Sequence, residues 1–205
     1  MTKLIQLREQ VRVRIGVPVV DSFQDGPVID QYINHALDTI ESEARWPWME
    51  TVGQPVTVAD TDTIAVPSDW SATRSLFIDD DELHLRSPAD IHLWNPDDRG
   101  RPQVWSLIGS NLHLRPTPDA VYTLTHLYYK TPTALSADTD APDMPDHLTG
   151  AIVAKAAELL AVREDDRGAA SAHLAEYVGW LRRMRAYKRR TTGPLRVRVR
   201  EGSWV

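Results

Sequence analysis

The spacing of apolar residues changes twice along this chain of 205 residues, and this change limits the folds that it can adopt. Near both ends the apolar residues recur every three or four positions, which predicts amphipathic helices. Between about residues 50 and 130 they alternate with polar residues, which predicts β-strands with one buried face. The sequence therefore predicts helices at both ends of the chain and a β region between them.

Two helices are expected before residue 50. The first ends at Gly16 and carries an apolar stripe of Leu4, Leu7, Val11 and Ile15. The second begins with Pro27 as its first helical residue, because proline needs no backbone N–H donor there, and it runs to about Ala44. Its apolar stripe consists of Ile29, Tyr32, Ile33, Ala36, Leu37 and Ile40.

The middle of the chain predicts roughly six or seven short antiparallel strands. Proline, glycine and aspartate residues separate them, as is typical of β-turns. The expected strands are residues 55–59, 62–67, 74–79, 82–87, 103–109, 111–116 and 121–130. One helical turn interrupts them, with Ser87 as its N-cap and Pro88 as its first residue.

The last third of the chain returns to helical spacing. Two further helices are expected within residues 145–164 and 169–190, on either side of a turn at residues 165–168. Their apolar stripes are Leu148, Ile152, Ala156, Leu159 and Leu160 in the first, and Leu174, Tyr177, Val178, Leu181 and Met184 in the second.

Helices at the two ends of a chain can bury their apolar faces against each other. The expected fold class is therefore α+β: a four-helix bundle with an inserted antiparallel β lobe and an extended C-terminal tail. The expected boundaries are residues 1–48 for the N-terminal helices, 49–132 for the β lobe, 133–147 for a linker, 148–190 for the C-terminal helices and 191–205 for the tail.

The passage from helix to β lobe contains Trp46, Pro47 and Trp48. Pro47 disfavours helical geometry at the residue before it, so the helix is expected to end there. The two indoles are large enough to fill the seam between bundle and β lobe. We predict that these three residues form a structural junction.

Basic residues concentrate at the C-terminal end. From Arg182 onward there are nine basic residues and one acidic residue, a net charge of +8, whereas residues 1–181 hold 14 basic and 28 acidic residues, a net charge of −14. A basic end on an acidic body favours docking onto nucleic acid or onto an acidic protein surface, including that of a second copy.

The end of the chain alternates apolar and basic residues after Gly193–Pro194. This period of two predicts an extended strand with its arginines on one side. The residues expected to bind a partner protein are Leu195, Arg196, Val197, Arg198, Val199, Arg200 and Trp204. Pairing of this strand with the chain's own β lobe is the alternative.

No catalytic, cofactor or metal site is expected. The chain has no cysteine, no phosphate-binding glycine loop and no Gly-x-Ser-x-Gly nucleophile turn. The acidic stretch at residues 79–82 is interpreted as a hairpin turn rather than a cation site. His84, His113 and His126 are interpreted as outward polar residues of strands. The apolar runs are too short to cross a bilayer.

Three stretches of the chain resemble a known family. They are the Trp-Pro-Trp junction with the hairpin after it, the Pro-x-Pro-Asp and Tyr-Tyr segment at residues 116–129, and the Pro-Asp at residues 145–146 that precedes a helix. Together, over residues 25–185, they resemble the head–tail connector adaptors of tailed bacteriophages, the family that includes tail tubular protein A.

The resemblance implies a structural protein of the virion neck, made in the host cytoplasm, and not an enzyme. Such a protein forms a ring under the portal, following its twelvefold symmetry, extends the DNA channel and offers a docking surface to a tail-side protein. The implied partners are the portal protein, a neck or tail protein, further copies of the chain, and double-stranded DNA that passes without sequence-specific binding. No cofactor or membrane is implied.

Two other functions remain open. A DNA-binding accessory protein could use the basic residues 182–200, with Tyr187 among them. An enzyme whose catalytic groups come from distant positions would need a concave site with perturbed carboxylates. An acidic channel wall, which would keep DNA from adhering, is a further expectation of the connector hypothesis.

Overall fold

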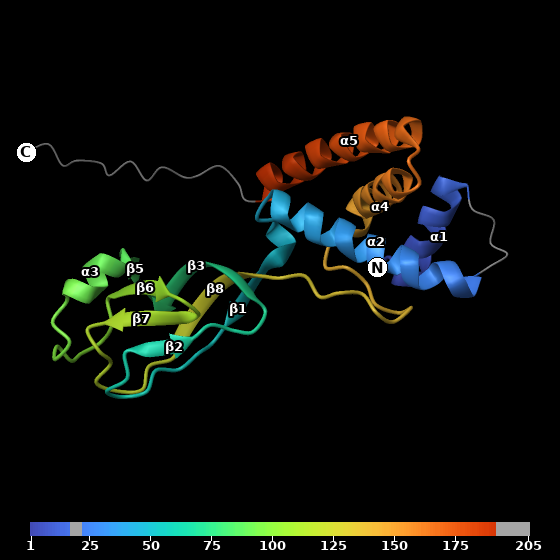
Figure 1. Cartoon of the computed structure of the whole chain (residues 1–205). Helices are drawn as coiled ribbons and strands as arrows, with labels where there is room; N and C mark the ends of the chain where they lie inside the picture. Colours follow the sequence, from blue (N-terminus) through green and yellow to red (C-terminus); the bar gives the residue numbers. More distant parts are fainter. Residues whose placement is uncertain (17–21, 192–205) are drawn as a thin grey trace, which may run out of the picture. The chain divides into compact units, whose positions relative to one another are not determined.

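The computed structural model describes residues 1–16 and 22–191. The chain divides into two compact units (Figure 1). A helical unit comprises Met1–Trp48 and the residues from Thr133 onward, and a β unit comprises Met49–Pro132. The class is therefore α+β, as expected.

The helical unit contains α1 (Leu4–Ile15), α2 (Ser22–Glu43), α4 (Gly150–Arg163) and α5 (Arg167–Thr191). A short 3-10 turn at Asp146–Leu148 also belongs to this unit, and another at Pro47–Met49 lies where the chain passes into the β unit. The first helix agrees with the prediction, since Leu4, Leu7 and Val11 are buried and Gly16 ends the helix with a φ of 71°. The predicted start of α2 is wrong, because the helix begins at Ser22 and Pro27 lies inside it.

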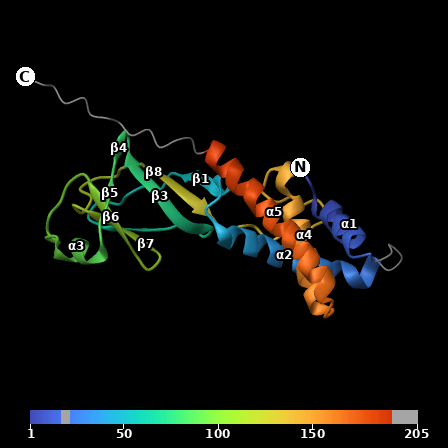
Figure 2. The ribbon, with the colours of Figure 1, turned by 90° about the horizontal axis from the view of Figure 1, so that it is seen from above.

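The expected four-helix bundle is not present. Instead α4 packs against α1, α2 and α5. It lies between α5 and α2 in Figure 1, and α5 crosses in front of it in the view from above (Figure 2). A bundle helix keeps one polar face for solvent. In α4, by contrast, the four consecutive residues from Ala151 to Ala154 are all buried, and they point in all directions around the helix axis. Such a helix is stable only in the middle of its neighbours.

Residues 133–147, expected as a linker, are tied to the helices by hydrogen bonds. The Asn34 side chain of α2 donates to the carbonyl oxygen of Leu135 at 2.9 Å and accepts from its amide at 2.8 Å. At the start of α1 the Leu4 amide donates to the carbonyl of Asp140 at 2.7 Å. Backbone groups of an irregular segment need such partners when they lie against a protein surface.

The β unit consists of two four-stranded sheets, in the orders β1-β8-β3-β4 and β2-β7-β6-β5. The strand bounds in the first sheet are β1 (Glu50–Gly53), β3 (Trp70–Ile78), β4 (Asp81–Glu82) and β8 (Leu124–Lys130); in the second they are β2 (Thr63–Ala65), β5 (His84–Leu85), β6 (Val104–Ile108) and β7 (Asn111–Arg115). All strand pairs are antiparallel except β5 with β6, which is parallel. The prediction missed β1 and wrongly placed a strand at residues 55–59.

Leu83 carries the chain from one sheet to the other. The sequence predicted one strand over residues 82–87, but β4 and β5 belong to different sheets. Leu83 lies between them with 3% of its surface exposed, and its amide donates to the carbonyl of Leu76 at 2.8 Å. It joins the core formed by Leu76, Ile78, Trp105, Leu112, Leu114 and Leu124. The helical turn α3 (Pro88–Leu93) follows, capped by Ser87 as predicted.

Candidate interaction surface

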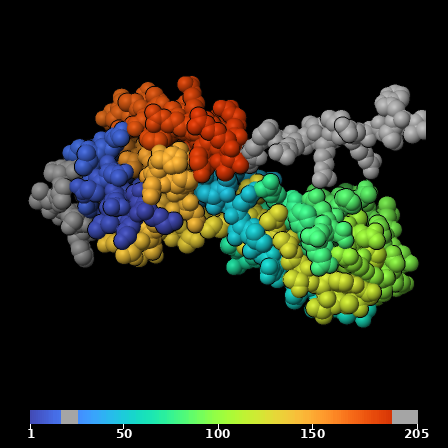
Figure 3. Space-filling view, turned by 180° about the vertical axis from the view of Figure 1, so that it is seen from behind, coloured from blue at the N-terminus to red at the C-terminus, as the bar shows by residue number. Residues whose placement is uncertain are grey.

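The helix α5 forms part of the outer surface of the helical unit (Figure 3). Tyr177, Leu181 and Met184 face inward and are buried. Leu174 and Val178, which the periodicity placed on the same buried stripe, are 45% and 39% exposed. Because α5 packs mainly on α4, the single row of buried side chains is enough to form that contact. The wider stripe predicted from the sequence is therefore wrong, and two apolar side chains remain in contact with solvent.

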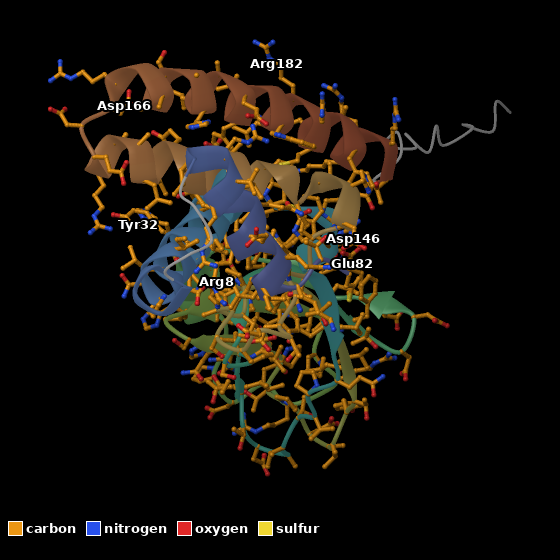
Figure 4. All side chains as sticks on the ribbon, turned by 90° about the vertical axis from the view of Figure 1, so that its right-hand side faces the viewer. Arg8, Tyr32, Glu82, Asp146, Asp166 and Arg182 are labelled. Atoms are coloured by element: carbon orange, nitrogen blue, oxygen red, sulfur yellow. The ribbon has the colours of Figure 1, made fainter. Side chains whose placement is uncertain are left out.

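The last turns of α5 carry five exposed arginines: Arg182, Arg183, Arg185, Arg189 and Arg190. Arg185 pairs with Glu43 at 3.3 Å. Within residues 1–16 and 22–191 no carboxylate pairs with the other four. Arg182 points away from the helical unit in Figure 4. Cations at a helix C-terminus complement its dipole, but four unpaired guanidinium groups also form a surface that attracts anions.

Trp180 of α5 lies directly on the first residue of α4. A β-carbon on Gly150 would come within 2.3 Å of the Trp180 ring, so only glycine allows this approach. The indole Nε1 donates to Glu176 at 3.5 Å, and Glu176 also pairs with Arg14 of α1. These contacts fix the indole in place. A single glycine near a helix start is the one sign of these contacts in the sequence.

Four rings form a chain of aromatic contacts in the helical unit. Trp46 stacks on Trp48 with the ring centroids 5.1 Å apart, and Trp48 lies 6.1 Å from Tyr187. Tyr187 in turn meets His147 edge to face at 5.5 Å. Trp46 is fully buried, and its Nε1 donates to the carbonyl of Ile40 at 2.7 Å. Because the Trp46 indole is buried and its N–H has a hydrogen-bond acceptor, its position is well defined. The rings stacked on it therefore support the end of α5.

A hollow of about 300 Å³, which we name the α5 groove, lies beside these rings. Its lining residues are His147, Leu148, Trp180, Arg183, Ala186, Tyr187 and Arg190. The Arg183 guanidinium lies over the Trp180 ring, 4.6 Å from its centroid. Apolar rings with two unpaired guanidinium groups beside them fit a ligand that combines a carboxylate or phosphate with an apolar group. Of the surfaces described, this groove is the best candidate for binding a partner.

Tyr177, on the buried face of α5, illustrates the packing beneath this surface. Burial raises the pKa of its hydroxyl to about 12, with the charge of Glu43 adding to the effect. The hydroxyl has no hydrogen-bond partner among the described residues, and Lys155 lies 5.4 Å from the ring centroid. A phenol that stays protonated and unpaired acts here as a packing group.

The groups considered for metal binding have other roles. Asp79–Glu82 forms the expected hairpin between β3 and β4, where Arg101 pairs with Asp79 and with Asp81, each at 3.1 Å. In the described part of the chain, no three histidine or acidic side chains gather in a way that could hold a metal ion.

The prediction that His126 faces outward is wrong. The side chain is fully buried, its Nε2 lies 2.9 Å from the Thr73 hydroxyl, and burial lowers its pKa. His84 is exposed, as expected, and His113 lies partly buried with its Nδ1 3.9 Å from Asp62. None of the three is placed with a second histidine as a ligand pair.

The predicted interaction residues Leu195, Arg196, Val197, Arg198, Val199, Arg200 and Trp204 lie outside the described residues. The part that Trp46, Pro47 and Trp48 play at the seam stays a prediction. Among the helices of residues 1–16 and 22–191, none combines the length and apolar content needed to cross a membrane.

No curated protein matches this sequence. A family model described as SU10 adaptor protein matches residues 2–198, a range that takes in both units. The likeness to tail tubular protein A in particular stays a prediction. With a match over nearly its whole length, the chain belongs to the SU10 adaptor protein family.

Proposed function

We propose that this chain is a structural head–tail adaptor of a tailed bacteriophage, joining the portal to the tail. The observation that carries the proposal is the family match over residues 2–198, because it includes both units rather than one shared fold element. The adaptor family suggests a virion component that interacts with portal and tail proteins and has no catalytic role.

We further propose that the copies form a ring under the portal, following its twelvefold symmetry and extending the DNA channel. To form a ring, a subunit needs a solvent-exposed surface that a neighbouring copy can cover. The helix α5 has such a surface, with exposed Leu174 and Val178 and a row of arginines. Individual contacts can be weak, because a portal that presents many sites raises the effective concentration of neighbouring copies. Acidic faces toward the channel would keep DNA from adhering.

The tail at residues 191–205 is proposed to reach the portal or a neighbouring copy. The alternating Leu195, Val197 and Val199 would bind an apolar groove or a sheet edge, while the arginines between them meet acidic groups. Trp204 would anchor the end. Trp46, Pro47 and Trp48 are proposed as the structural junction where the chain passes from the helical to the β unit.

Binding to purified portal rings tests the adaptor function. The full chain should co-sediment with portal rings and add one further layer of density under them in electron micrographs. A chain that lacks residues 193–205 should keep its circular dichroism spectrum and lose most of this binding. If the full chain does not bind portal rings at any ratio, the proposal is wrong.

A DNA-binding accessory protein is the second candidate, and the unpaired arginines of α5 favour it. Fluorescence anisotropy with a double-stranded oligonucleotide separates the two. For an adaptor we expect weak binding that disappears between about 50 and 200 mM salt, because only phosphate contacts hold the DNA. DNA binding that persists at the higher salt, together with no portal binding, would favour the accessory protein.

A further inference from the structure

We propose that the α5 groove binds the acidic tip of the β3–β4 hairpin, residues 79–82, of a second copy of the same chain. This inference rests on the proposed ring and names the two surfaces that join neighbouring copies. The contact would join a basic surface and an acidic surface, each of which has charged side chains without an ion-pair partner among the described residues.

The groove is prepared for an acidic partner. Arg183 and Arg190 have no carboxylate partner among the described residues, and the Arg183 guanidinium lies over the Trp180 ring, 4.6 Å from its centroid. A guanidinium that is already oriented loses little conformational entropy on binding. Tryptophan, tyrosine and arginine, all present in this lining, are also the residues that most often dominate binding energy in protein interfaces.

The hairpin tip supplies the opposite charge. Asp79, Asp80, Asp81 and Glu82 are all exposed, and Arg101 is the cation that pairs with two of them. Within the described residues the carboxylates of Asp80 and Glu82 have no partner. The turn has a defined shape, because Asp79 adopts a φ of 55° and Phe77 pairs with Glu82 across the two strands.

The exposed acidic turn between α4 and α5 is a poorer partner. Glu164, Asp165 and Asp166 connect α4 to α5, but Arg163 and Arg167 flank them. Asp165 already lies 3.6 Å from Arg167, and Asp166 accepts a hydrogen bond from the Ala169 amide at 2.9 Å to cap α5. This turn therefore has less uncompensated charge than the hairpin tip.

The two surfaces are different patches on the same chain. A contact between different patches is heterologous. When it is repeated, it gives a ring if the rotation between neighbouring copies closes after a whole number of copies, and an open filament if it does not. The hairpin tip of a second copy thus pairs with the arginines in the α5 groove of the first. The groove of the second copy remains open and can bind the hairpin tip of a third.

Disulfide trapping tests the contact, because the chain contains no cysteine of its own. We would mix one variant carrying Asp80→Cys with another carrying Ala186→Cys, a lining residue of the groove. Under mild oxidation the mixture should form the mixed dimer several-fold faster than a control mixture of Asp80→Cys with Arg182→Cys. Arg182 lies on the same helix but points away from the unit (Figure 4). Salt at about 1 M, where screening extends only ~3 Å, should remove the difference.

Charge reversal gives an independent readout. Arg183→Glu should lower the trapping rate several-fold, whereas Arg182→Glu, the same change one residue earlier, should leave it near the wild-type rate. Reversing the hairpin as well, with Asp80→Arg and Glu82→Arg beside Arg183→Glu, should restore association in sedimentation velocity. Equal trapping rates for the two cysteine pairs, or no recovery with the reversed pair, would overturn the contact.

Binding of the same variants to portal rings separates this inference from the proposed function. If trapping is unselective while the chain still binds portal rings, the contact is wrong and the adaptor function stands. If trapping is selective but portal rings are not bound, the contact stands and the adaptor function fails. If Arg183→Glu abolishes portal binding without changing the trapping rate, the groove belongs to the portal contact and our inference is wrong.

Discussion

The Trp180 ring lies so close to the backbone of Gly150 that a β-carbon there would be 2.3 Å from the nearest ring atom. This contact joins the start of α4 to the middle of α5, and it positions the indole that carries Arg183. The geometry of the groove thus depends on a residue that has no side chain.

Replacing Gly150 with alanine should destabilise the helical unit. The added methyl group would displace Trp180, and overpacking of this kind costs about 1–3 kcal/mol of unfolding free energy. Gly179→Ala is the matched control, because a β-carbon at Gly179 meets nothing within 4 Å. That change should stabilise α5 by up to about 1 kcal/mol, since alanine favours a helix interior. Urea unfolding midpoints that move in the same direction for both variants would contradict the contact.

The buried His126 should make the β unit less stable in mild acid. Burial lowers the pKa of His126, so the unfolded chain binds a proton that the folded chain does not. The contribution of the neutral His126 side chain to the unfolding free energy is fully present above a pH of about 6.5. It decreases as the pH falls below this value, by at most ~1.4 kcal/mol per pH unit.

Urea unfolding at pH 7.5 and 5.5, followed by a probe in the β unit, measures this effect. His126→Gln should reduce the difference between the two pH values, because glutamine does not titrate. His84→Gln, at an exposed histidine, should leave the difference unchanged. The same pH dependence in both variants would show that another group titrates.

Arg8 should contribute to the stability of the helical unit through its planar geometry. Its Nε and Nη2 donate to the two oxygens of Asp30 at 2.9 and 2.7 Å, and Nη1 donates to Asp138 at 3.0 Å. The hydrogen bonds to Asp30, followed by the charges of both carboxylates, raise the pKa of Arg8. Arg8→Lys keeps the charge but loses the paired geometry, and should lower the unfolding free energy by about 1–3 kcal/mol. Arg167→Lys, at an ion pair that is almost fully exposed, should change nothing measurable in the same unfolding assay.

Asn34 should hold residues 133–147 on α2. Its amide both donates to and accepts from the backbone of Leu135. Asn34→Asp replaces the donor by a carboxylate oxygen next to the Leu135 carbonyl, so we expect a loss of about 1–3 kcal/mol. Hydrogen exchange of the Leu135 amide should accelerate, and Ser42→Ala on the exposed end of α2 should leave it unchanged. If the Leu135 amide still exchanges slowly in the Asn34→Asp variant, other contacts hold this segment.

Local patterns predicted several elements well. Leu4, Leu7 and Val11 lie on one face of α1 because their spacing alone decides it, and Gly16 ends the helix through its own backbone freedom. Ser87 caps α3 as predicted, since a cap needs only a hydroxyl and an amide three residues later. The strands at 63–65, 104–108 and 111–115 also lie within predicted segments.

Other features needed the tertiary structure. The same spacing that placed Tyr177 and Leu181 inward also included Leu174 and Val178, because periodicity cannot tell how much of a helix face its neighbours cover. His126 alternates with apolar residues as His84 does, yet one is buried and the other exposed. Leu83 lies in a segment that reads as one strand, although the chain changes sheets there.

The sequence by itself determined where helices and strands occur, the charge contrast between the two ends of the chain, and the adaptor family to which it belongs. The tertiary structure decided that α4 is central, that Trp180 rests on Gly150, and that Arg183 and Arg190 share a groove with His147. The physical reason is that backbone preference and apolar spacing act between residues a few positions apart. Burial and the surroundings of a charge depend instead on segments distant in the sequence that folding brings together.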